Sequence, residues 1–364
     1  MTTVKMEFLI EKWFNKKISL DRIEKYRKQL KIEKRRLSED IDPDDLRVSC
    51  VERQIYPVNS IEKYIDMLCV FMEQAVKDNS HLIIFPEYNF FDLFGLIPGF
   101  SFLNQILNKK AIKNKGEEKD REEESHLKGN NYFLTTVFKG VAKPVEVGIK
   151  RIVSLLAKEY GLYIYIGSYI LKEKEEIYNA GSLFDPDGNL IGTQKKMHLT
   201  DFEVKLGMRR GNNMEAYSLP FGKVVCPICM DATYFETFRI AREMGADIVI
   251  LPIANLEEYS TWKALRGIWP RVQESYLYGL KSSLNGWIAG MHFTGKAGIF
   301  SPLSMTEKKD GVLSLSPSYE GNHLITAHIN LKKLHEAREK AEYHEDKNTE
   351  FEKNFIEKTY HING

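Results

Sequence analysis

The feature that most restricts the fold of this chain is an early alternation of buried strand, amphipathic helix and buried strand. The apolar runs at 46–52 and 81–85 predict two strands. Between them, residues 58–79 carry apolar side chains at helical spacing, and Asn59 or Ser60 is placed to cap the helix. A strand–helix–strand order is typical of layered folds in which helices cover a sheet. We therefore predict an α/β fold.

The same rhythm returns after a central interruption. Residues 91–147 begin apolar and then become a block of mixed charge, which predicts a solvated insertion loop on the core domain. Next we expect a helix over 146–161, a hairpin that turns at Asp-Pro-Asp-Gly (185–188), and a helix over 232–247. Another long helix is expected before residue 287, followed by four short strands. About a dozen strands and four core helices fit two sheets covered by helices.

These elements divide the chain into three regions. We assign a helical extension to 1–44, the core domain to 45–330 and a charged helical tail to 331–364. The extension contains a basic helix that begins after Ser19, with Ile23, Tyr26 and Leu30 on one face. Three roles are open for it: packing on its own domain, an oligomer contact, or docking to an anionic partner. The apolar stripe favours the first.

Composition restricts the class of protein. The chain has 364 residues, a formal net charge of +1 and four cysteines. The balanced charge gives no support to binding of nucleic acid or an anionic membrane. The few cysteines argue against a disulfide framework and favour a reducing compartment. With no signal-peptide pattern and no apolar run of about 18 residues, a cytoplasmic protein is expected.

Three polar residues follow predicted strands. Glu87 comes after HLIIFP, Lys196 after GNLIGTQK and Cys229 after KVVCPI. Ligands of α/β sheets bind beyond the carboxyl ends of strands, so these side chains could meet in one crevice. Taken singly, each has an ordinary interpretation, as a solvated charge or a core cysteine. Their joint order is more informative.

The segments around these residues resemble the three signature segments of the nitrilase, or carbon–nitrogen hydrolase, superfamily. They are FPEYNF, KKMHL and ICMDATYFETFR, in the expected order and spacing. Intervening segments, such as YNAGSLFDPDGNLIG and REMGADIVILP, are also similar. The resemblance covers about 46–330. It implies an α-β-β-α sandwich, pairing into homodimers, and a catalytic triad of glutamate, lysine and cysteine.

Carried over residue by residue, the resemblance assigns a role to each member of the triad. It implies that Cys229 is the nucleophile, Glu87 the general base and Lys196 the partner of the developing oxyanion. Glu203 is the best match for a second glutamate that family members often carry. Lys196 could also pair with a Cys229 thiolate, and the sequence leaves thiolate and general-base routes open.

Other residues near the motifs bear on the branch of the family and on substrate preference. Met230 and Asp231, which follow the nucleophile, resemble the amidase and carbamoylase branches, because nitrile-specific members tend to carry Trp-Glu there. His198 is interpreted as structural, since Lys196 occupies the matching position. Ser275 stands where Asn is usual, and Thr233-Tyr234-Phe235-Glu236 where many members have Arg-Phe-Pro-Glu. Substrate preference therefore cannot be borrowed from the family.

The CPIC segment admits three interpretations: a redox pair, half a zinc site, or one nucleophile with a neighbour. Residues three apart in a strand face opposite ways, which separates Cys226 from Cys229. A redox pair normally opens a helix after a strand. Zinc has no second cluster with ligand spacing, and nucleotide binding has no Walker or GxGxxG motif. We expect one nucleophile, with no metal and no cofactor.

The leading functional hypothesis is hydrolysis of a non-peptide carbon–nitrogen bond in a small amide or N-carbamoyl compound. A nitrilase and an N-acyltransferase that uses the same thioester are the alternatives within enzymes. A non-enzymatic scaffold is the alternative outside them, and the intact Glu87, Lys196 and Cys229 set argues against it. The expected partners are a small-molecule substrate and a second copy of the chain. The homodimer is expected to pair through helix 234–244 and the helix containing RVQES.

Overall fold

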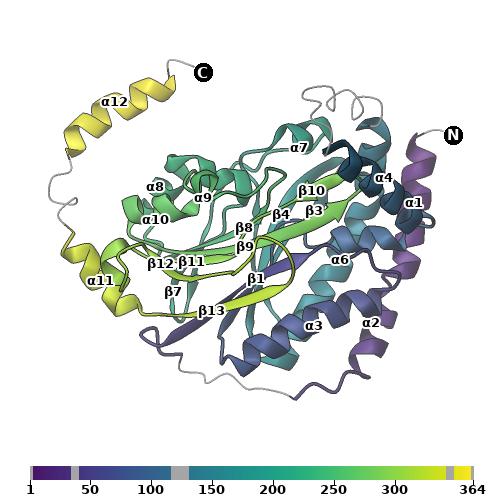
Figure 1. Cartoon of the computed structure of the whole chain (residues 1–364), viewed down its shortest axis with the longest axis horizontal. Coiled ribbons are helices and arrows are strands. Elements are labelled where there is room, and N and C mark those ends of the chain that lie inside the picture. The colour runs from purple at the N-terminus through teal and green to yellow at the C-terminus, as the bar shows by residue number, and fades with distance from the viewer. Residues whose placement is uncertain (1–2, 34–40, 116–130, 342–347, 362–364) are drawn as a thin grey trace.

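The computed structural model describes residues 3–33, 41–115, 131–341 and 348–361 (Figure 1). Its helices are α1 (Thr3–Lys17), α2 (Leu20–Arg27), α3 (Ile61–Lys77), α4 (Phe100–Lys115), α6 (Asn131–Tyr160), α7 (Asp201–Lys205), α8 (Phe235–Glu243), α9 (Thr261–Ala264), α10 (Ile268–Ser275), α11 (Leu331–Glu339) and α12 (Thr349–His361). Short 3-10 turns are η1 (Phe91–Leu96), η2 (Cys229–Thr233) and η3 (Leu303–Met305).

Its strands are β1 (Leu46–Gln54), β2 (Leu82–Ile84), β3 (Tyr163–Glu173), β4 (Glu176–Phe184), β5 (Leu190–Lys195), β6 (Ala216–Leu219), β7 (Gly222–Val225), β8 (Ile248–Ala254), β9 (Tyr278–Ile288), β10 (Met291–Phe293), β11 (Gly298–Phe300), β12 (Val312–Leu315) and β13 (His323–Ile329). Within the described residues they form one connected sheet, in the order β5-β4-β3-β2-β1-β9-β8-β7-β6. β13 pairs antiparallel with β1, and β11 with β9.

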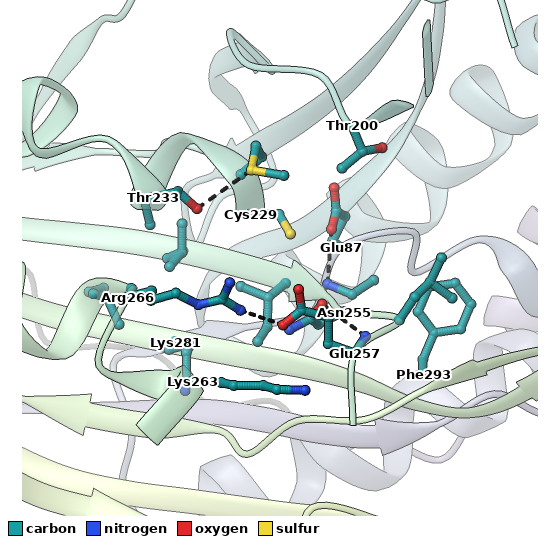
Figure 2. Close-up of a pocket in the computed structure, with 18 of the residues that line it drawn as sticks. Glu87, Thr200, Cys229, Thr233, Asn255, Glu257, Lys263, Arg266, Lys281 and Phe293 are labelled. Atoms are coloured by element: carbon teal, nitrogen blue, oxygen red, sulfur yellow. Dashed lines mark hydrogen bonds and ion pairs between the residues drawn. The ribbon is translucent and has the colours of Figure 1, made fainter. Parts of the chain in front are cut away.

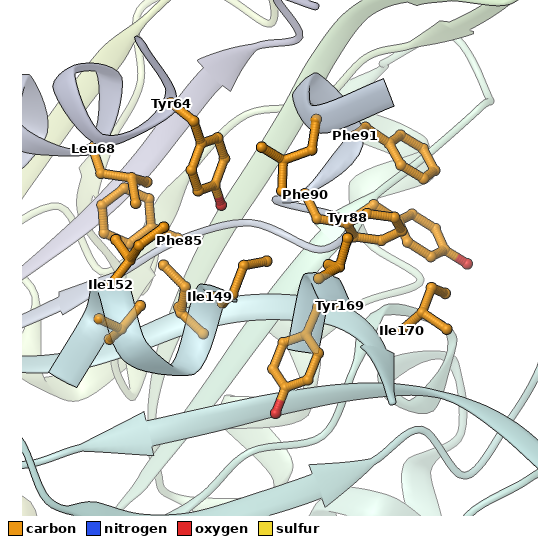
Figure 3. Packing of buried hydrophobic residues seen from close by; sticks show 14 of the residues in the cluster. Tyr64, Leu68, Phe85, Tyr88, Phe90, Phe91, Ile149, Ile152, Tyr169 and Ile170 are labelled. Carbon is orange, nitrogen blue, oxygen red and sulfur yellow. The ribbon is translucent and has the colours of Figure 1, made fainter. Parts of the chain in front are cut away.

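This sheet folds into two facing halves, and the cores on its faces show the layers. Between the halves, side chains of β1 and β2 meet side chains of β7, β8 and β9 in one cluster; examples are Val48, Ile84, Val224, Ile250 and Leu280. The outer face of the first half packs against α1, α2, α3 and α6. Figure 3 shows the part of this cluster formed with α3 and α6. The outer face of the second half packs against α8 and α10. The predicted α-β-β-α sandwich is confirmed.

Several local predictions are confirmed by the caps and turns. Ser60 caps α3 and accepts a hydrogen bond from the Lys63 N–H at 3.4 Å. Asp185 Oδ1 accepts from the Asn189 N–H at 2.8 Å across the hairpin turn, where Gly188 takes a positive φ of 83°. That left-handed conformation is open to glycine at little strain, which is why Asp-Pro-Asp-Gly predicts the turn correctly.

The prediction of an insertion loop over 91–147 is wrong for much of that segment. Its described part forms η1, α4 and the first half of α6, which begins at Asn131 and continues through Pro144. The reason is a helical row of buried apolar residues that precedes the proline, including Phe138, Val141 and Val145. Burial of this row outweighs the disfavoured proline. The expected block of mixed charge lies largely at 116–130, outside the described residues.

The long helix expected before residue 287 is also wrong. Two short helices, α9 and α10, are followed by β9, which lies at the centre of the sheet between β1 and β8. Tyr276 follows the last residue of α10 and caps it, with a left-handed φ of 50° and ψ of 60°. β9 is buried on both faces and therefore lacks the alternation that identifies a half-exposed strand.

The N-terminal helices pack on their own domain. Ser19 caps α2 as predicted, and Phe14, Ile18 and Ile23 are buried against the core. α1 lies along α6 in Figure 1. At the other end, α11 begins after the Asn330 cap and buries Leu331 in the inter-sheet core. None of the described helices is both long enough and apolar enough to traverse a bilayer.

Candidate active site

A cavity of about 460 Å³ opens at the ends of the central strands (Figure 2). Glu87, Lys196 and Cys229 all line it, although they are far apart in the sequence. Its other walls come from α7, the end of β8, the segment 255–268, and β9. The structure thus brings the three predicted residues into one crevice.

Glu87 follows β2 and is completely buried. Its Oε1 accepts hydrogen bonds from Lys196 Nζ and Asn179 Nδ2, each at 2.8 Å. Its Oε2 accepts from the Ala254 N–H at 2.9 Å, at the end of β8. The next residue, Tyr88, has a φ of 51°, a conformation that strains a non-glycine residue. Donors from three separate segments therefore fix the direction of this carboxylate.

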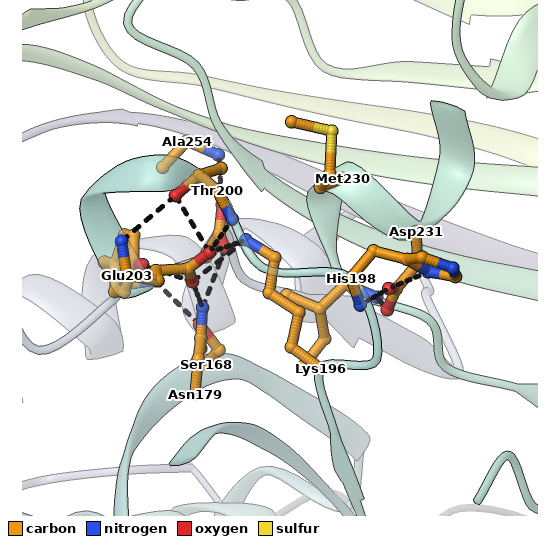
Figure 4. A network of polar contacts seen from close by, with 12 residues as sticks. Ser168, Asn179, Lys196, His198, Thr200, Glu203, Met230, Asp231 and Ala254 are labelled. Atoms are coloured by element: carbon orange, nitrogen blue, oxygen red, sulfur yellow. Dashed lines mark hydrogen bonds and ion pairs between the residues drawn. The ribbon is translucent and has the colours of Figure 1, made fainter. Parts of the chain in front are cut away.

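Lys196 bridges two carboxylates (Figure 4). Beyond Glu87, its Nζ lies 2.8 Å from Glu203 Oε2 and 3.0 Å from Glu203 Oε1. Asn179 Nδ2 also spans both carboxylates, donating to Glu203 Oε1 at 2.7 Å, and the Tyr88 hydroxyl donates to the same oxygen at 2.5 Å. Each buried charge has several partners, which is what a low-dielectric site requires.

Glu203 is held in place by the start of its own helix. Its Oε2 accepts from the Thr200 N–H at 2.8 Å, and the Thr200 hydroxyl accepts from the Glu203 N–H at 3.4 Å. This reciprocal pair is a capping box, which α7 needs because it has only five residues. Oε2 thus caps the helix, and both carboxylate oxygens of Glu203 lie within hydrogen-bond distance of Lys196 Nζ.

Cys229 is presented by a strained turn. It opens η2 with a φ of 47°, a left-handed value that costs an ordinary residue about 1–2 kcal/mol. The Asp231 carboxylate supports this turn by accepting from the Ile228 N–H at 2.8 Å. Its Oδ1 also accepts from the His198 N–H at 2.7 Å and the Met197 N–H at 3.2 Å. Asp231 therefore ties the Cys229 turn to the segment that carries Lys196.

The pKa values in the cluster follow from burial and from these charges. Burial raises the pKa of the Cys229 thiol well above its ordinary value, and the Glu87 charge raises it further, against the opposing Lys196 charge. Burial also raises the pKa of Glu87, while Lys196 opposes the shift. Burial acts to raise the pKa of Glu203 too, but Lys196 and the Tyr88 and Thr200 donors hold it below its usual value. Despite burial, the carboxylates raise the pKa of Lys196.

The remaining sequence candidates lie around this cluster in different roles. Met230 lines the cavity, whereas Asp231 is fully buried and its carboxylate accepts hydrogen bonds from backbone N–H groups. His198 is not among the residues that line the cavity; its Nδ1 lies 2.9 Å from Asp231 Oδ1 and its ring stacks on Tyr234 at 4.2 Å. Cys226 lies one residue beyond β7, and its side chain packs in the inter-sheet core. The two cysteines of CPIC thus occupy separate environments, and both are free.

Sequence reasoning missed the residues that support the carboxylates. Tyr88 lies in the FPEYNF segment and Asn179 in the YNAGSLFDPDGNLIG segment, yet their importance rests on contacts with residues distant in sequence. The Ala254 N–H is a backbone group, so no side chain indicates its role. Lys281, another residue that lines the cavity, was missed because β9 was read as part of a helix. A lysine inside an apolar run, Leu277 to Leu284, was the available signal.

Comparison with known proteins shows the family and the fold. The model of the carbon-nitrogen hydrolase family matches residues 47–339. The chain therefore belongs to the carbon–nitrogen hydrolase family. The fold is similar to that of a carbon-nitrogen hydrolase from Helicobacter pylori G27, with a TM-score of 0.62 and 20% identity, over 86% of this chain and 98% of that one. An amidase from Nesterenkonia sp. gives a TM-score of 0.58 and 17% identity, over 87% and 99%.

Among curated proteins, the similarity is partial. The probable hydrolase YhcX of Bacillus subtilis is 28% identical over 166 residues, which cover 43% of this chain and 32% of that protein. The omega-amidase NIT2 of Danio rerio is 29% identical over 131 residues, 34% of this chain and 47% of that protein. The chain thus spans about a third to a half of the length of these relatives.

Proposed function

We propose that this chain hydrolyses the carbon–nitrogen bond of a small amide through a Cys229 thioester, with Glu87 and Lys196 as its acid–base and electrostatic partners. The observation that carries the proposal is the meeting of all three side chains in one cavity, with Lys196 Nζ 2.8 Å from Glu87. The names of the relatives, an omega-amidase among them, support amide substrates.

The pKa directions support a general-base route. The raised pKa of Cys229 means that the resting group is a thiol and not a thiolate. The raised pKa of Glu87 makes its carboxylate a stronger base than an ordinary one. In this route Glu87 takes the thiol proton as the sulfur bonds to the amide carbon. Lys196 stabilises the oxyanion that forms.

The tetrahedral intermediate then breaks down to the thioester, and the thioester is hydrolysed. The carbon–nitrogen bond breaks, and the leaving ammonia or amine takes the proton that Glu87 holds. Glu87 next removes a proton from water, whose oxygen attacks the thioester carbon. The carbon–sulfur bond breaks, and the sulfur recovers the proton. Glu203 does not transfer a proton here; its pKa below the usual value keeps it charged beside Lys196.

An ammonia-release screen over amides, N-carbamoyl amino acids and nitriles tests the proposal. We expect release from amides by the wild type and none by Cys229→Ala. Hydroxylamine added to the same reaction reveals the thioester, because it intercepts it as a hydroxamate. Formation of the free carboxylic acid when no amine is added separates hydrolysis from acyl transfer. Release confined to nitriles would favour the nitrilase alternative. Equal release by wild type and Cys229→Ala would overturn the mechanism.

Two further features remain proposals. A homodimer that pairs through α8 and α10 is supported by exposed apolar residues on α8, where Phe235 is 56% and Ile240 50% exposed. Light scattering at micromolar concentration tests it, and a strict monomer would contradict it. A reducing, cytoplasmic location is supported by four free cysteines. Fractionation of cells that express the tagged chain tests the location.

A further inference from the structure

Lys281 is a second buried lysine in the cavity wall, and no residue described in the structure forms an ion pair or hydrogen bond with its amine. It lies on β9, is only 7% exposed, and lines the same cavity as Cys229 (Figure 2). The Phe300 ring lies 5.5 Å from the amine. A buried ammonium group without an acceptor is costly, so its presence beside a ligand cavity calls for a partner.

The nearby acids do not supply that partner. Glu52 is the acidic group that acts most strongly on Lys281, but its oxygens are already bound: Oε2 accepts from the Ala297 N–H at 3.1 Å and from the Ser316 hydroxyl, and Oε1 from Asn285 at 3.4 Å. Cys50 is a buried thiol, since burial raises its pKa. Lys296 is a further cation that acts on the amine.

The charged residues that line the cavity are three acids, Glu87, Asp201 and Glu257, and four bases, Lys196, Lys263, Arg266 and Lys281, which leaves one positive charge in excess. Lys263 and Arg266 also line the cavity, and Glu257 forms an ion pair with Arg266. Glu87 forms an ion pair with Lys196. Lys263 donates to the Glu258 carbonyl at 3.3 Å and so has no carboxylate partner in the described residues. A small ligand that carries an anionic group would meet excess positive charge here.

We propose that Lys281 is a specificity-determining residue that binds a carboxylate of the substrate while the amide carbon lies at Cys229. The inference rests on the proposed amide hydrolysis and adds the class of substrate. Two sources fit the shared chemistry: the monoamide of a dicarboxylic acid, with the carboxylate on the acyl half, and an N-carbamoyl amino acid, with the carboxylate on the leaving half.

The environment of Lys281 adds a pH signature. Burial lowers the pKa of its amine to about 8, against the raising effect of Glu52. The free enzyme therefore loses this positive charge as the pH rises through about 8. For an anionic amide, kcat/KM is expected to fall over that range, whereas a neutral amide of the same length lacks this limb. Groups that take part in the reaction affect kcat/KM for both substrates alike. The pH dependence of the ratio of the two kcat/KM values therefore reports on Lys281.

The experiment compares succinic acid monoamide, N-carbamoyl-β-alanine and the neutral pentanamide. We expect Lys281→Met to lower the ratio of anionic to neutral kcat/KM by about 10- to 100-fold, the size of one buried charge-assisted contact. Lys296→Met is the matched control, since Lys296 is a neighbouring cation that is not among the residues lining the cavity. The two anionic substrates show which half carries the carboxylate.

The outcomes separate this inference from the proposed function. An unchanged ratio in Lys281→Met, with neutral amide still hydrolysed, overturns the role of Lys281 alone. No turnover of any amide by the wild type overturns the proposed function. In that case calorimetric titration of succinate into wild type and Lys281→Met still decides the inference. Binding weakened at least about tenfold by Lys281→Met supports the anion site, and equal or absent binding in both proteins rejects it.

Discussion

Two buried lysines line the same cavity, and their surroundings differ. Lys196 touches the Glu87 and Glu203 carboxylates, and these charges raise its pKa despite burial. Lys281 has no such contact in the described residues, and burial lowers its pKa to about 8. The first lysine is a permanent charge locked into a network. The second is a charge that depends on pH and on what enters the cavity.

The difference shows that burial alone does not define the role of a charged residue. Around Lys196 each carboxylate oxygen is also held by other donors, such as Asn179 and the Ala254 N–H, so the geometry is fixed before a substrate arrives. The Lys281 wall lacks this preorganisation. Fixed charges suit the stabilisation of a transition state, whereas an unpaired charge suits recognition of a ligand.

The largest expected effect tests whether the chemistry belongs to the Lys196 side of the cavity. Replacement of Cys229 by alanine is expected to lower kcat by at least about 10³-fold, because no thioester can form. Ammonia release measures kcat, and circular dichroism confirms that the fold survives. Cys226→Ala is the control, because that sulfur packs in the inter-sheet core, and it is expected to retain most activity. Equal loss in both variants would revive the redox pair.

The next effect comes from replacing Lys196 by methionine. It leaves Glu87 and Glu203 buried without their cation, which is expected to reduce the free energy of unfolding by about 3–5 kcal/mol and kcat by at least about 100-fold. Urea denaturation and steady-state kinetics measure the two quantities.

Because this variant is strongly destabilised, Glu87→Gln serves as its companion. The glutamine keeps the shape of the side chain but cannot act as the base. We expect it to fold and to lose at least about 100-fold in kcat, with a smaller change in KM. Near-normal kcat in Glu87→Gln would show that Glu87 is not the base. The assignment of catalysis to the Lys196 network and of substrate recognition to Lys281 would then lose its basis.

A smaller effect is expected from Asp231→Asn. The carboxylate accepts from three backbone N–H groups that link the Cys229 turn to the Lys196 segment, and the amide turns one acceptor into a donor. We expect a loss of about 1–3 kcal/mol in stability and about tenfold in kcat. Asp187→Asn, in an exposed turn, is the control. Unchanged kcat would show that the alignment of the two segments does not depend on this carboxylate.

The last effect concerns the stability of Lys281→Met and has the opposite sign to that of Lys196→Met. In the wild type the folded amine loses its proton near pH 8, whereas the unfolded lysine keeps it until about pH 10.4. Between these values the unfolded state binds more protons, so wild-type stability rises with pH, by up to about 3 kcal/mol.

The variant is therefore expected to be at least as stable as the wild type at pH 7, and to lose that advantage by pH 10. Urea denaturation at both pH values measures the difference. If the difference in free energy of unfolding between the two proteins is the same at pH 7 and pH 10, the pKa of Lys281 is not lowered. The contrast with Lys196 would then rest only on the absence of a carboxylate contact.

Much of the fold could be predicted from local pattern. Strand–helix–strand alternation, the Ser60 cap and the Asp-Pro-Asp-Gly turn are short-range features, and each led to the correct element. The errors arose where burial outweighed local preference. α6 runs through Pro144 because its apolar row is buried, and β9 was missed because burial on both faces removes the alternation of a strand.

The sequence by itself predicted Glu87, Lys196 and Cys229 as candidate site residues, because they stand in motifs of contiguous residues after strands, and the structure places all three in one cavity. It could not reveal Asn179 between two carboxylates, the Ala254 N–H on Glu87, or an amine on β9 without a partner. These depend on contacts between segments that are far apart in the sequence, and Glu87 and Ala254 are separated by 167 residues. Whether a buried charge is paired is a property of what surrounds it in space. For that reason only the tertiary structure could distinguish Lys196 from Lys281.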